Sequence, residues 1–372
     1  APSSGEAALS GLDHPVVALL VEYRSLQKML STYIEGWKEF MVGPELFLGT
    51  KLHGTVTGRY SSRLHQVPRD GTIRNLIEAP PGWTFVQGDL SQAELRVAAI
   101  ASGDPELIRC YNEGIDVHWR TTLNVLQMGG SEEYIRMARE TVAKDYPLEY
   151  DAPLERICHL LSVMGHDRAI EIDKRWKEKR KQSKGINFGY LYGMGAWKFA
   201  EYAKLKYDWE VDHYEAEEIR NAFFSTYSSL SSWHERQRQL VKIDGFVRSL
   251  IGRKRRLPGI WSPDKGVRAE CERQAINSPI QGFIGDLKVM GMLDIYDKIQ
   301  VPSSGSALRI KGEVHDSILM WVKDEYLEEV LPQVKECMER PSTLMKFGVE
   351  LPVPIVADLE VGVWGAGKTW KF

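Results

Sequence analysis

The sequence has few cysteines, no long apolar run and no excess of positive charge. Its four cysteines are far apart and form no C-x-x-C pair, which argues against a zinc site and favours a reduced, intracellular setting. No run of 18 apolar residues exists, so the sequence predicts no membrane span. The net charge of −3 excludes a polycation, so any nucleic-acid binding has to come from local basic patches.

Apolar residues make up 43% of the 372 positions, enough for two or three packed subdomains. The start, APSSGEAALSGLDHP, lacks the pattern of a signal peptide and reads as a flexible leader or an end left by a cut. Two basic stretches stand out, KRWKEKRKQSK at 174–184 and RSLIGRKRR at 248–256. Each alone is more typical of a solvent-exposed helix or loop face than of a binding site.

Periodicity predicts a mixture of helices and strands. Apolar spacing indicates a helix over 15–41, and residues 84–102 begin as a strand and become a helix after Ser91. Residues 272–296 read as a helix that is interrupted near Ser278-Pro279. Strands are expected near residues 85, 310, 320 and 356. With a long helical stretch between the first two strands, the pattern predicts an α+β fold.

Two aspartates stand at strand ends. Asp89 ends the strand TFVQGD, and Asp316 lies in GEVHDSILMWV (312–322), in a hairpin turn that carries neither Asn-Gly nor Asp-Gly. If the two strands are neighbours, both carboxylates meet at one sheet edge. Two Mg²⁺ ions held there would activate a hydroxyl and stabilise a leaving pyrophosphate. The alternative is that each aspartate only caps a helix or shapes a turn.

The stretch RKQSKGINFGYLYGMG (180–195) has a side chain suited to binding at every fourth position: Arg180, Lys184, Phe188 and Tyr192. On a helix these form a slanted stripe about 18 Å long, cationic at one end and aromatic at the other. Such a stripe suits a triphosphate and a base. A parallel stripe consists of Gly185, Gly189 and Gly193. Close approach of a base pair, or tight packing against a neighbouring helix, would explain these glycines.

These stretches resemble the motifs of family A DNA polymerases, the group of bacterial DNA polymerase I and its phage relatives. GDLSQAELR (88–96) resembles motif A, RKQSKGINFGYLYGMG resembles motif B and VHDS (314–317) resembles motif C. Four further stretches agree in order: VEYRSLQKMLSTY (21–33), TGRYSS with HQVP (57–68), DVH (116–118) and RQAINSPIQG (273–282).

The resemblance implies a right-hand polymerase fold with an antiparallel-sheet palm, helical fingers and a truncated thumb. The expected parts are a thumb base and leader (1–50), a first palm part with motif A (51–100), fingers with motif B (101–258) and a second palm part with motif C (259–372). Between His118 and Arg180 the chain is longer than the resemblance leads one to expect. A helical insertion is therefore predicted at about 127–170, either solvent-exposed or binding a partner.

The resemblance also implies roles for single residues. Two Mg²⁺ ions, replaceable by Mn²⁺, would be held by Asp89, Asp316 and the Leu90 carbonyl. The incoming nucleotide would contact His118, Arg180, Lys184, Phe188, Tyr192, Glu94 and Gln92. Of these, Lys184 would protonate the leaving pyrophosphate, and Glu94 would exclude a 2′-hydroxyl. DNA would contact Arg59, Arg273, Asn277, Gln281 and His315.

The implied function is template-directed DNA synthesis from deoxynucleoside triphosphates on a primer–template, without a proofreading domain in this chain. The implied location is the cytoplasm of a bacterium or of a phage-infected cell, or an organelle, and a processivity or companion protein is an open alternative as a partner. Ser317 departs from motif C, which usually has Glu there, and matches the His-Asp-Ser of single-subunit RNA polymerases. An RNA polymerase and a catalytically weakened DNA-binding subunit are therefore alternatives, although Glu94 and Phe188 favour the DNA enzyme.

Overall fold

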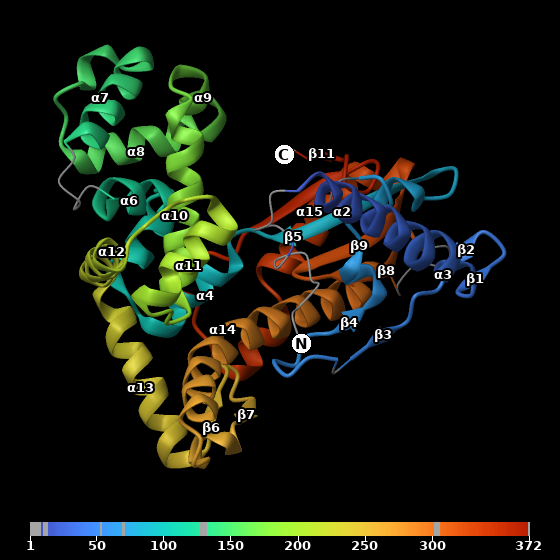
Figure 1. Cartoon of the computed structure of the whole chain (residues 1–372). Helices are drawn as coiled ribbons and strands as arrows, with labels where there is room; N and C mark the ends of the chain where they lie inside the picture. Colours follow the sequence, from blue (N-terminus) through green and yellow to red (C-terminus); the bar gives the residue numbers. More distant parts are fainter. Residues whose placement is uncertain are drawn as a thin grey trace.

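The chain folds into a sheet-containing part and a mostly helical part, with one long helix, α14, running between them (Figure 1). The structure is a computed structural model that describes residues 9, 14–52, 54–68, 71–126, 132–300 and 306–370. The leader predicted at the N-terminus, residues 9 and 14 excepted, and the start of the predicted insertion at 127–131 lie outside the described residues. No helix in the described part is long and apolar enough to cross a membrane.

The central sheet is antiparallel, with strand order β11-β10-β5-β9-β8. Its strands are β5 (Trp83–Leu90), β8 (Leu308–Val314), β9 (Ser317–Lys323), β10 (Ala357–Val361) and β11 (Lys368–Thr369). The four predicted strands are therefore confirmed, and the strand that holds Asp89 pairs directly with the strand that follows Asp316. Because more than 200 residues separate β5 from β8 and β9, segments far apart in sequence meet in this sheet.

The two faces of the sheet are buried in different cores, as the period of two along a strand requires. Val86 and Leu90 enter the main core, whereas Phe85 enters a second core. Helix α15 (Leu327–Glu339) covers the first face, and a Cβ at Gly88 would lie 2.6 Å from the sulfur of Met338. Glycine at position 88 therefore allows α15 to pack directly on β5.

Helix α14 (Lys265–Ile295) is continuous through Pro279, so the predicted interruption at this point is wrong. Asp264 caps the helix and accepts hydrogen bonds from the amides of Gly266 and Val267. An interior proline costs a helix about 3 kcal/mol. Here Pro279 is buried, and the helix packs against α4, α13 and α15, so tertiary packing outweighs the local penalty.

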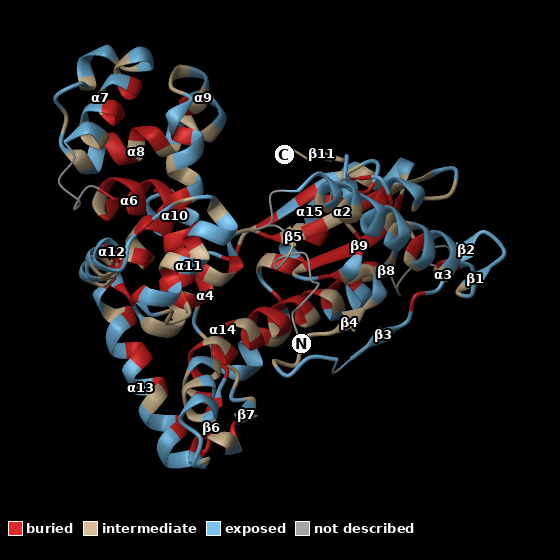
Figure 2. Ribbon diagram, in the orientation of Figure 1, coloured by how far each residue is buried: buried red, intermediate tan, exposed pale blue. Residues whose placement is uncertain are grey.

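The remaining large helices form the helical part, and the buried residues concentrate where they face one another (Figure 2). They are α4 (Ala93–Ser102), α5 (Pro105–Asn112), α6 (Val117–Asn124), α7 (Glu133–Asp145), α8 (Leu154–Met164), α9 (His166–Ile172), α10 (Arg175–Leu191), α11 (Ala196–Tyr207), α12 (His213–Thr226) and α13 (Ser228–Asp244). The predicted insertion is helical where it is described, with α7 and α8 inside its bounds. Cys110, Cys158, Cys271 and Cys337 are buried and form no disulfide.

The N-terminal helix was predicted over 15–41, and the structure ends it slightly earlier. Helix α2 (Pro15–Lys28) continues through a π-helical segment (Met29–Glu35) into α3 (Gly36–Lys38), and β1 (Met41–Val42) follows. No residue of α2 is buried. An exposed apolar stripe, with residues three or four positions apart, consists of Val16, Leu19, Tyr23, Leu26 and Leu30.

Short two-stranded ladders complete the fold. They pair β1 with β2 (Glu45–Leu46), β3 (Thr50–Lys51) with β4 (Ser61–Ser62), and β6 (Phe246–Arg248) with β7 (Lys254–Arg256). The basic stretch at 248–256 is thus the hairpin β6–β7, whereas the basic stretch at 174–184 lies mainly on α10.

Candidate active site

Asp89 and Asp316 lie at the same end of the central sheet. In the ladder between β5 and β9, Asp89 is directly opposite Ser317, and Asp316 immediately precedes Ser317. His315 and Asp316 form a two-residue loop between β8 and β9, and His315 has a φ of +54°, the conformation that glycine or asparagine usually supplies. The juxtaposition that the sequence predicted for these two carboxylates is therefore present.

Lys288 of α14 contacts the loop and the strand before it. Its ammonium donates a hydrogen bond to the carbonyl of His315 at 2.8 Å and forms a buried ion pair with Glu313. On the other side, Nη2 of Arg59 lies 3.0 Å from Oδ1 of Asp316. No sequence pattern indicated a role for Lys288 and Glu313, since their contact joins residues 25 positions apart in different elements.

The donor set fits Mg²⁺. Oδ1 of Asp316 is buried and faces the Arg59 guanidinium at 3.0 Å, and Asp89 and Leu90 end strand β5 beside it. Mg²⁺ takes hard oxygen ligands and usually binds through one or two carboxylates, together with waters and substrate phosphates. Among the described residues, no group of three or more His, Cys, Asp or Glu side chains could hold a metal. A pair of carboxylates matches that mode of binding.

The proposed triphosphate end of the α10 stripe is tied to α6. Both terminal nitrogens of Arg180 donate to Asp116, which caps α6 through the amides of His118 and Trp119. Lys184 lies one turn further along α10, with its side chain exposed. The sequence pattern included Asp116 in DVH, but only the structure shows it as the partner of Arg180.

His118 is only 4% exposed and is neutral near pH 7. Burial lowers its pKa to about 4, and the charges of Arg180 and Lys184 act in the same direction. The amide nitrogen of Asn187 donates to Nδ1 at 2.8 Å, while the Asn187 oxygen accepts from Thr121 at 2.7 Å. Since Nδ1 is an acceptor, the neutral ring carries its proton on Nε2, which is thus a hydrogen-bond donor.

His166 is a further residue of this group that the sequence did not indicate. It begins α9, inside the predicted insertion, and its ring centre lies 6.3 Å from that of Trp119. The guanidinium of Arg180 lies 5.3 Å from the centre of the same Trp119 ring. The predicted insertion therefore contributes to the surroundings of Arg180 through Trp119, and no local sequence signal could have shown this.

At the aromatic end, three elements bring Glu94, Tyr192 and Gln281 together. Nε2 of Gln281 on α14 donates to Glu94 of α4 at 3.3 Å, and Tyr192 lies just beyond the end of α10. Burial raises the pKa of Glu94, and the nearby Tyr192, Arg59 and Gln281 act in the opposite direction. Phe188, one turn before Tyr192, is half-buried.

Gln92 lies apart from that cluster. It is the left-handed residue that caps α4, with a φ of +49°, and its side chain is exposed and accepts a hydrogen bond from the Tyr111 hydroxyl at 3.3 Å.

The glycine stripe of α10 faces α11, so the structure supports helix packing as its explanation. A Cβ at Gly185 would lie 3.0 Å from the ring of Tyr207, and one at Gly189 would lie 2.9 Å from the ring of Phe199. Gly193 follows the helix with a φ of +70°, which favours glycine for a different reason. The close approach of a base pair does not account for Gly185 and Gly189.

The residues expected to contact DNA lie along α14 and beside the β8–β9 loop. Arg273, Asn277 and Gln281 follow one another at intervals of four on α14, and Arg273 is paired with Glu270. A cavity of about 520 Å³ between the end of α10 and α14 is lined by residues including Tyr192, Lys198, Arg238, Arg273 and Asn277. His315 is exposed at the tip of its loop.

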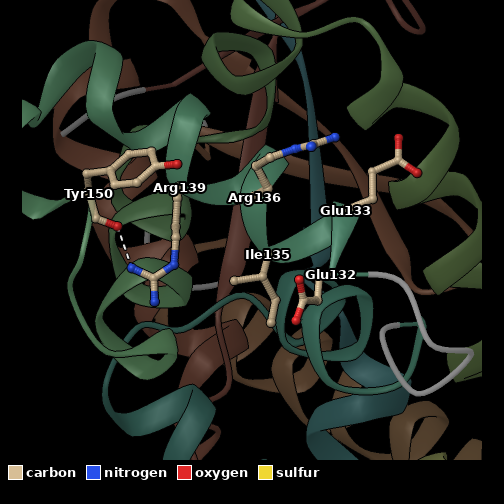
Figure 3. Close-up of a pocket in the computed structure, with 6 residues that line it drawn as sticks. All are labelled: Glu132, Glu133, Ile135, Arg136, Arg139 and Tyr150. Atoms are coloured by element: carbon tan, nitrogen blue, oxygen red, sulfur yellow. Dashed lines mark hydrogen bonds between the residues drawn. The ribbon is translucent and has the colours of Figure 1, made fainter.

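A second cavity, of about 490 Å³, lies on α7, in the predicted insertion. It is lined by Glu132, Glu133, Ile135, Arg136, Arg139 and Tyr150 (Figure 3). Arg139 donates to the Tyr150 carbonyl, and Glu133 is paired with Arg175. The two arginine side chains point in different directions, so the cavity offers no convergent binding group.

The sequence matches the family described as "DNA polymerase family A" over residues 1–146 and 166–370. The chain belongs to this family. It is 30% identical over 379 residues to "DNA polymerase I, thermostable" of Thermus filiformis, covering 99% of this chain and 38% of that protein. It is 29% identical over 373 residues to DNA polymerase I of Pseudomonas aeruginosa, covering 97% and 35%.

A solved structure described as "POL domain of Pol1 from M. smegmatis complex with DNA primer-template and dNTP" matches with a TM-score of 0.74 and 23% identity. The match covers 98% of this chain and 57% of that chain. This structural similarity confirms the predicted right-hand polymerase fold. The chain spans well under half the length of these curated family A relatives. Residues 147–165, which the family match omits, lie inside the predicted insertion, and the other predicted domain boundaries stay predictions.

Proposed function

We propose that this family A chain is a template-directed DNA polymerase that adds deoxynucleoside monophosphates to a primer 3′-hydroxyl by two-metal-ion phosphoryl transfer, without proofreading by this chain. The observation that carries the proposal is the position of Asp89 opposite Ser317, which puts Asp89 and Asp316 at one end of the sheet. The proposed partners are primer–template DNA and deoxynucleoside triphosphates, the ligands named for the M. smegmatis structure.

Asp89, Asp316 and the Leu90 carbonyl would hold two Mg²⁺ ions, and Mn²⁺ would serve in their place. When bound, the ions activate the attacking hydroxyl and neutralise charge on the pyrophosphate. The protein contributes positions fixed by the sheet, because the backbone of Asp89 is paired on both sides, with β9 and with β10. Arg59, beside Asp316, would contact the primer terminus.

The stripe on α10 would bind the triphosphate. Arg180 and Lys184 supply positive charge, and His118 supplies a neutral Nε2–H donor because its pKa is low. Lys184, the exposed member, would protonate the leaving pyrophosphate. Asp116 accepts two hydrogen bonds from the Arg180 guanidinium, and these two bonds set the orientation of the guanidinium.

Phe188 and Tyr192 would frame the nascent base pair, and Gln92 would support the nucleotide from the start of α4. Glu94, held by Gln281, would exclude a ribose 2′-hydroxyl. The side chains that would contact the primer terminus or the minor groove of the DNA are Arg273, Asn277, Gln281 and His315.

Primer extension with Mg²⁺ and deoxynucleotides tests the proposal. The wild-type chain should extend the primer, and Asp89→Ala and Asp316→Ala should each lower the rate at least about 100-fold, since even the loss of a hydrogen-bond partner of a metal ligand costs about 10–100-fold. Asp244→Asn, an exposed aspartate at the end of α13, is the control and should extend normally. No extension by the wild type, or full activity in either alanine variant, would contradict the proposal.

A second candidate, an RNA polymerase, is favoured by one observation, Ser317 after His315-Asp316. Comparing incorporation of deoxy- and ribonucleotides separates the two. The proposed DNA enzyme should prefer deoxynucleotides, and Glu94→Ala should raise ribonucleotide use. Efficient ribonucleotide incorporation by the wild type would support the RNA enzyme. Salt-sensitive primer–template binding without turnover would instead indicate a non-catalytic DNA-binding subunit.

A further inference from the structure

Ser317 makes a short hydrogen bond to Asp89. Its hydroxyl donates to Oδ1 of Asp89 at 2.6 Å, between residues directly opposite in the β5–β9 ladder. Ser317 is only 6% exposed, and a hydrogen bond to a carboxylate is stronger than one between neutral groups. The serine that departs from motif C is therefore in contact with the proposed metal ligand.

Two more side chains extend this contact into the protein. Nε2 of Gln87 donates to the Ser317 hydroxyl oxygen at 3.3 Å, and Nε1 of Trp364 donates to Oε1 of Gln87 at 2.8 Å. Gln87, Asp89 and Ser317 lie on one face of the sheet, because Gln87 and Asp89 are two positions apart and Ser317 is opposite Asp89. The chain of contacts runs Trp364, Gln87, Ser317, Asp89.

Each of the three hydrogen bonds from Trp364 to Asp89 has a fixed direction. An indole N–H can only donate, so the Gln87 oxygen has to face Trp364 and its NH₂ group has to face Ser317. Since the Ser317 oxygen already accepts from Gln87, its single proton points to Asp89. The hydroxyl thus presents a donor to Oδ1 of Asp89, which favours one orientation of the carboxylate.

The far end of the chain is anchored in the second core. Trp364 is 1% exposed, its ring stacks on Phe85 at 5.9 Å between centres, and the Arg74 guanidinium lies 4.9 Å from the Trp364 ring centre. A side chain that is almost fully buried and packed against these two groups has little freedom to turn, so the direction of its N–H is set by packing. This rigidity is transmitted to Asp89 through Gln87 and Ser317.

We propose that Trp364, Gln87 and Ser317 form a relay that orients the Asp89 carboxylate for divalent-cation binding, where related chains would have a third carboxylate. This inference rests on the proposed role of Asp89 as a metal ligand. Ser317 is a positioning residue, since it supplies a proton to the ligand and no negative charge to the cation. The site then works with two carboxylates and a directed hydroxyl.

Binding of Mn²⁺ tests the relay without relying on turnover. Free Mn²⁺ is measured by electron paramagnetic resonance during titration of the chain with a dideoxy-terminated primer–template and a deoxynucleotide. Ser317→Ala should weaken Mn²⁺ binding about tenfold, as outer-shell partners of metal ligands typically do. Trp364→Phe keeps an aromatic ring, although a smaller one, and removes the N–H, and Gln87→Leu removes the amide. Each should weaken binding by a smaller factor.

The relay also predicts non-additivity. Adding Gln87→Leu to Ser317→Ala should weaken Mn²⁺ binding no further, because Gln87 acts on Asp89 only through Ser317. Ser317→Thr, which keeps the hydroxyl, should bind more tightly than Ser317→Ala. Ser102→Ala removes a hydroxyl at the end of α4 that donates to the Ala98 carbonyl of the same helix, and is the control expected to bind like the wild type.

The outcomes separate the two levels of the proposal. If Asp89→Ala weakens Mn²⁺ binding while Ser317→Ala does not, or if the double variant shows additive losses, the relay is wrong and the role of Asp89 stands. If Asp89→Ala binds Mn²⁺ like the wild type, both are wrong. Thermal unfolding of each variant verifies that binding is compared between folded proteins.

Discussion

Asp116 holds Arg180 through both of its carboxylate oxygens, at 2.9 and 2.6 Å, and also caps helix α6. One side chain therefore joins α6 to α10 and fixes the guanidinium in the proposed triphosphate site. The pair is mostly buried, so the loss of either partner leaves the other without compensation.

Asp116→Asn should lower the free energy of unfolding by about 1–3 kcal/mol, because the cap is kept and the ion pair is lost. Asp116→Ala should cost about 1 kcal/mol more, since the cap is lost as well. Urea unfolding measures both, with the exposed Asp167→Asn as the control. Equal stability of Asp116→Asn and the wild type would contradict the importance of the pair.

The same pair has a pH signature. Burial alone would raise the pKa of Asp116, but the hydrogen bonds and charge of Arg180 bring the pKa below its ordinary value. A lowered carboxyl pKa stabilises the fold above the unfolded pKa, near 4, and this stabilisation is lost as the pH falls through the folded pKa. The stability difference between wild type and Asp116→Asn should therefore be constant above about pH 5 and shrink below pH 4.

Two buried histidines should make the fold less stable in mild acid. Burial lowers the pKa of both His118 and His234 to about 4. Between pH 6.5 and 4 the unfolded chain binds protons that the folded chain does not. The free energy of unfolding therefore decreases as the pH is lowered, by at most about 3 kcal/mol per histidine. His118→Gln and His234→Gln should each flatten the dependence of unfolding free energy on pH, and the exposed His213→Gln should leave it unchanged. Unaltered slopes in the first two variants would disprove this account.

Gly189→Ala tests the packing of α10 on α11. Alanine favours a helix by about 1 kcal/mol over glycine, but its Cβ would meet the Phe199 ring at 2.9 Å, and overpacking costs about 1–3 kcal/mol. We expect net destabilisation in chemical unfolding, partly relieved when Phe199→Leu is added. Gly195→Ala, where a Cβ has nothing within 4 Å, is the control and should change stability by less than about 1 kcal/mol. A Gly189→Ala variant that is more stable than wild type would contradict the packing role.

Phe188→Tyr should improve the use of dideoxynucleotides, because the resemblance to family A implies that phenylalanine at this position goes with poor use of them. One added hydrogen bond of about 1–1.5 kcal/mol corresponds to roughly tenfold in relative incorporation. Chain termination in a primer-extension assay measures the ratio, and the half-buried Phe224→Tyr on α12 is the control. Unchanged termination would refute the role assigned to Phe188.

The sequence was sufficient for features that depend on local pattern. Apolar runs predicted the strands, their ends predicted that Asp89 and Asp316 share one end of the sheet if the strands pair, and the residue stripe predicted most of α10. The sequence was insufficient for features that depend on packing between segments far apart in the chain. Pro279 predicted a break that packing around α14 overrides, and the glycines of α10 were explained only by Phe199 and Tyr207 of the next helix.

The role of Ser317 shows the same limit. The sequence shows that position 317 lacks a carboxylate, but it does not show the compensating contacts. Gln87 lies 230 positions before Ser317, and Trp364 lies 277 positions after Gln87. Likewise, His166 joins the surroundings of Arg180 through a shared contact with Trp119. Such contacts depend on tertiary folding and leave no periodic trace.

Helix α2 has a consequence for the dynamics of the chain. None of its 14 residues is buried, so tertiary packing contributes little to it, and isolated helices of this length are marginal in water. Its amide protons should exchange with solvent faster than those of any core helix in the described chain. A second helix laid along Leu19, Tyr23 and Leu26 would slow that exchange, which makes α2 a built-in reporter of whatever associates with this edge of the protein.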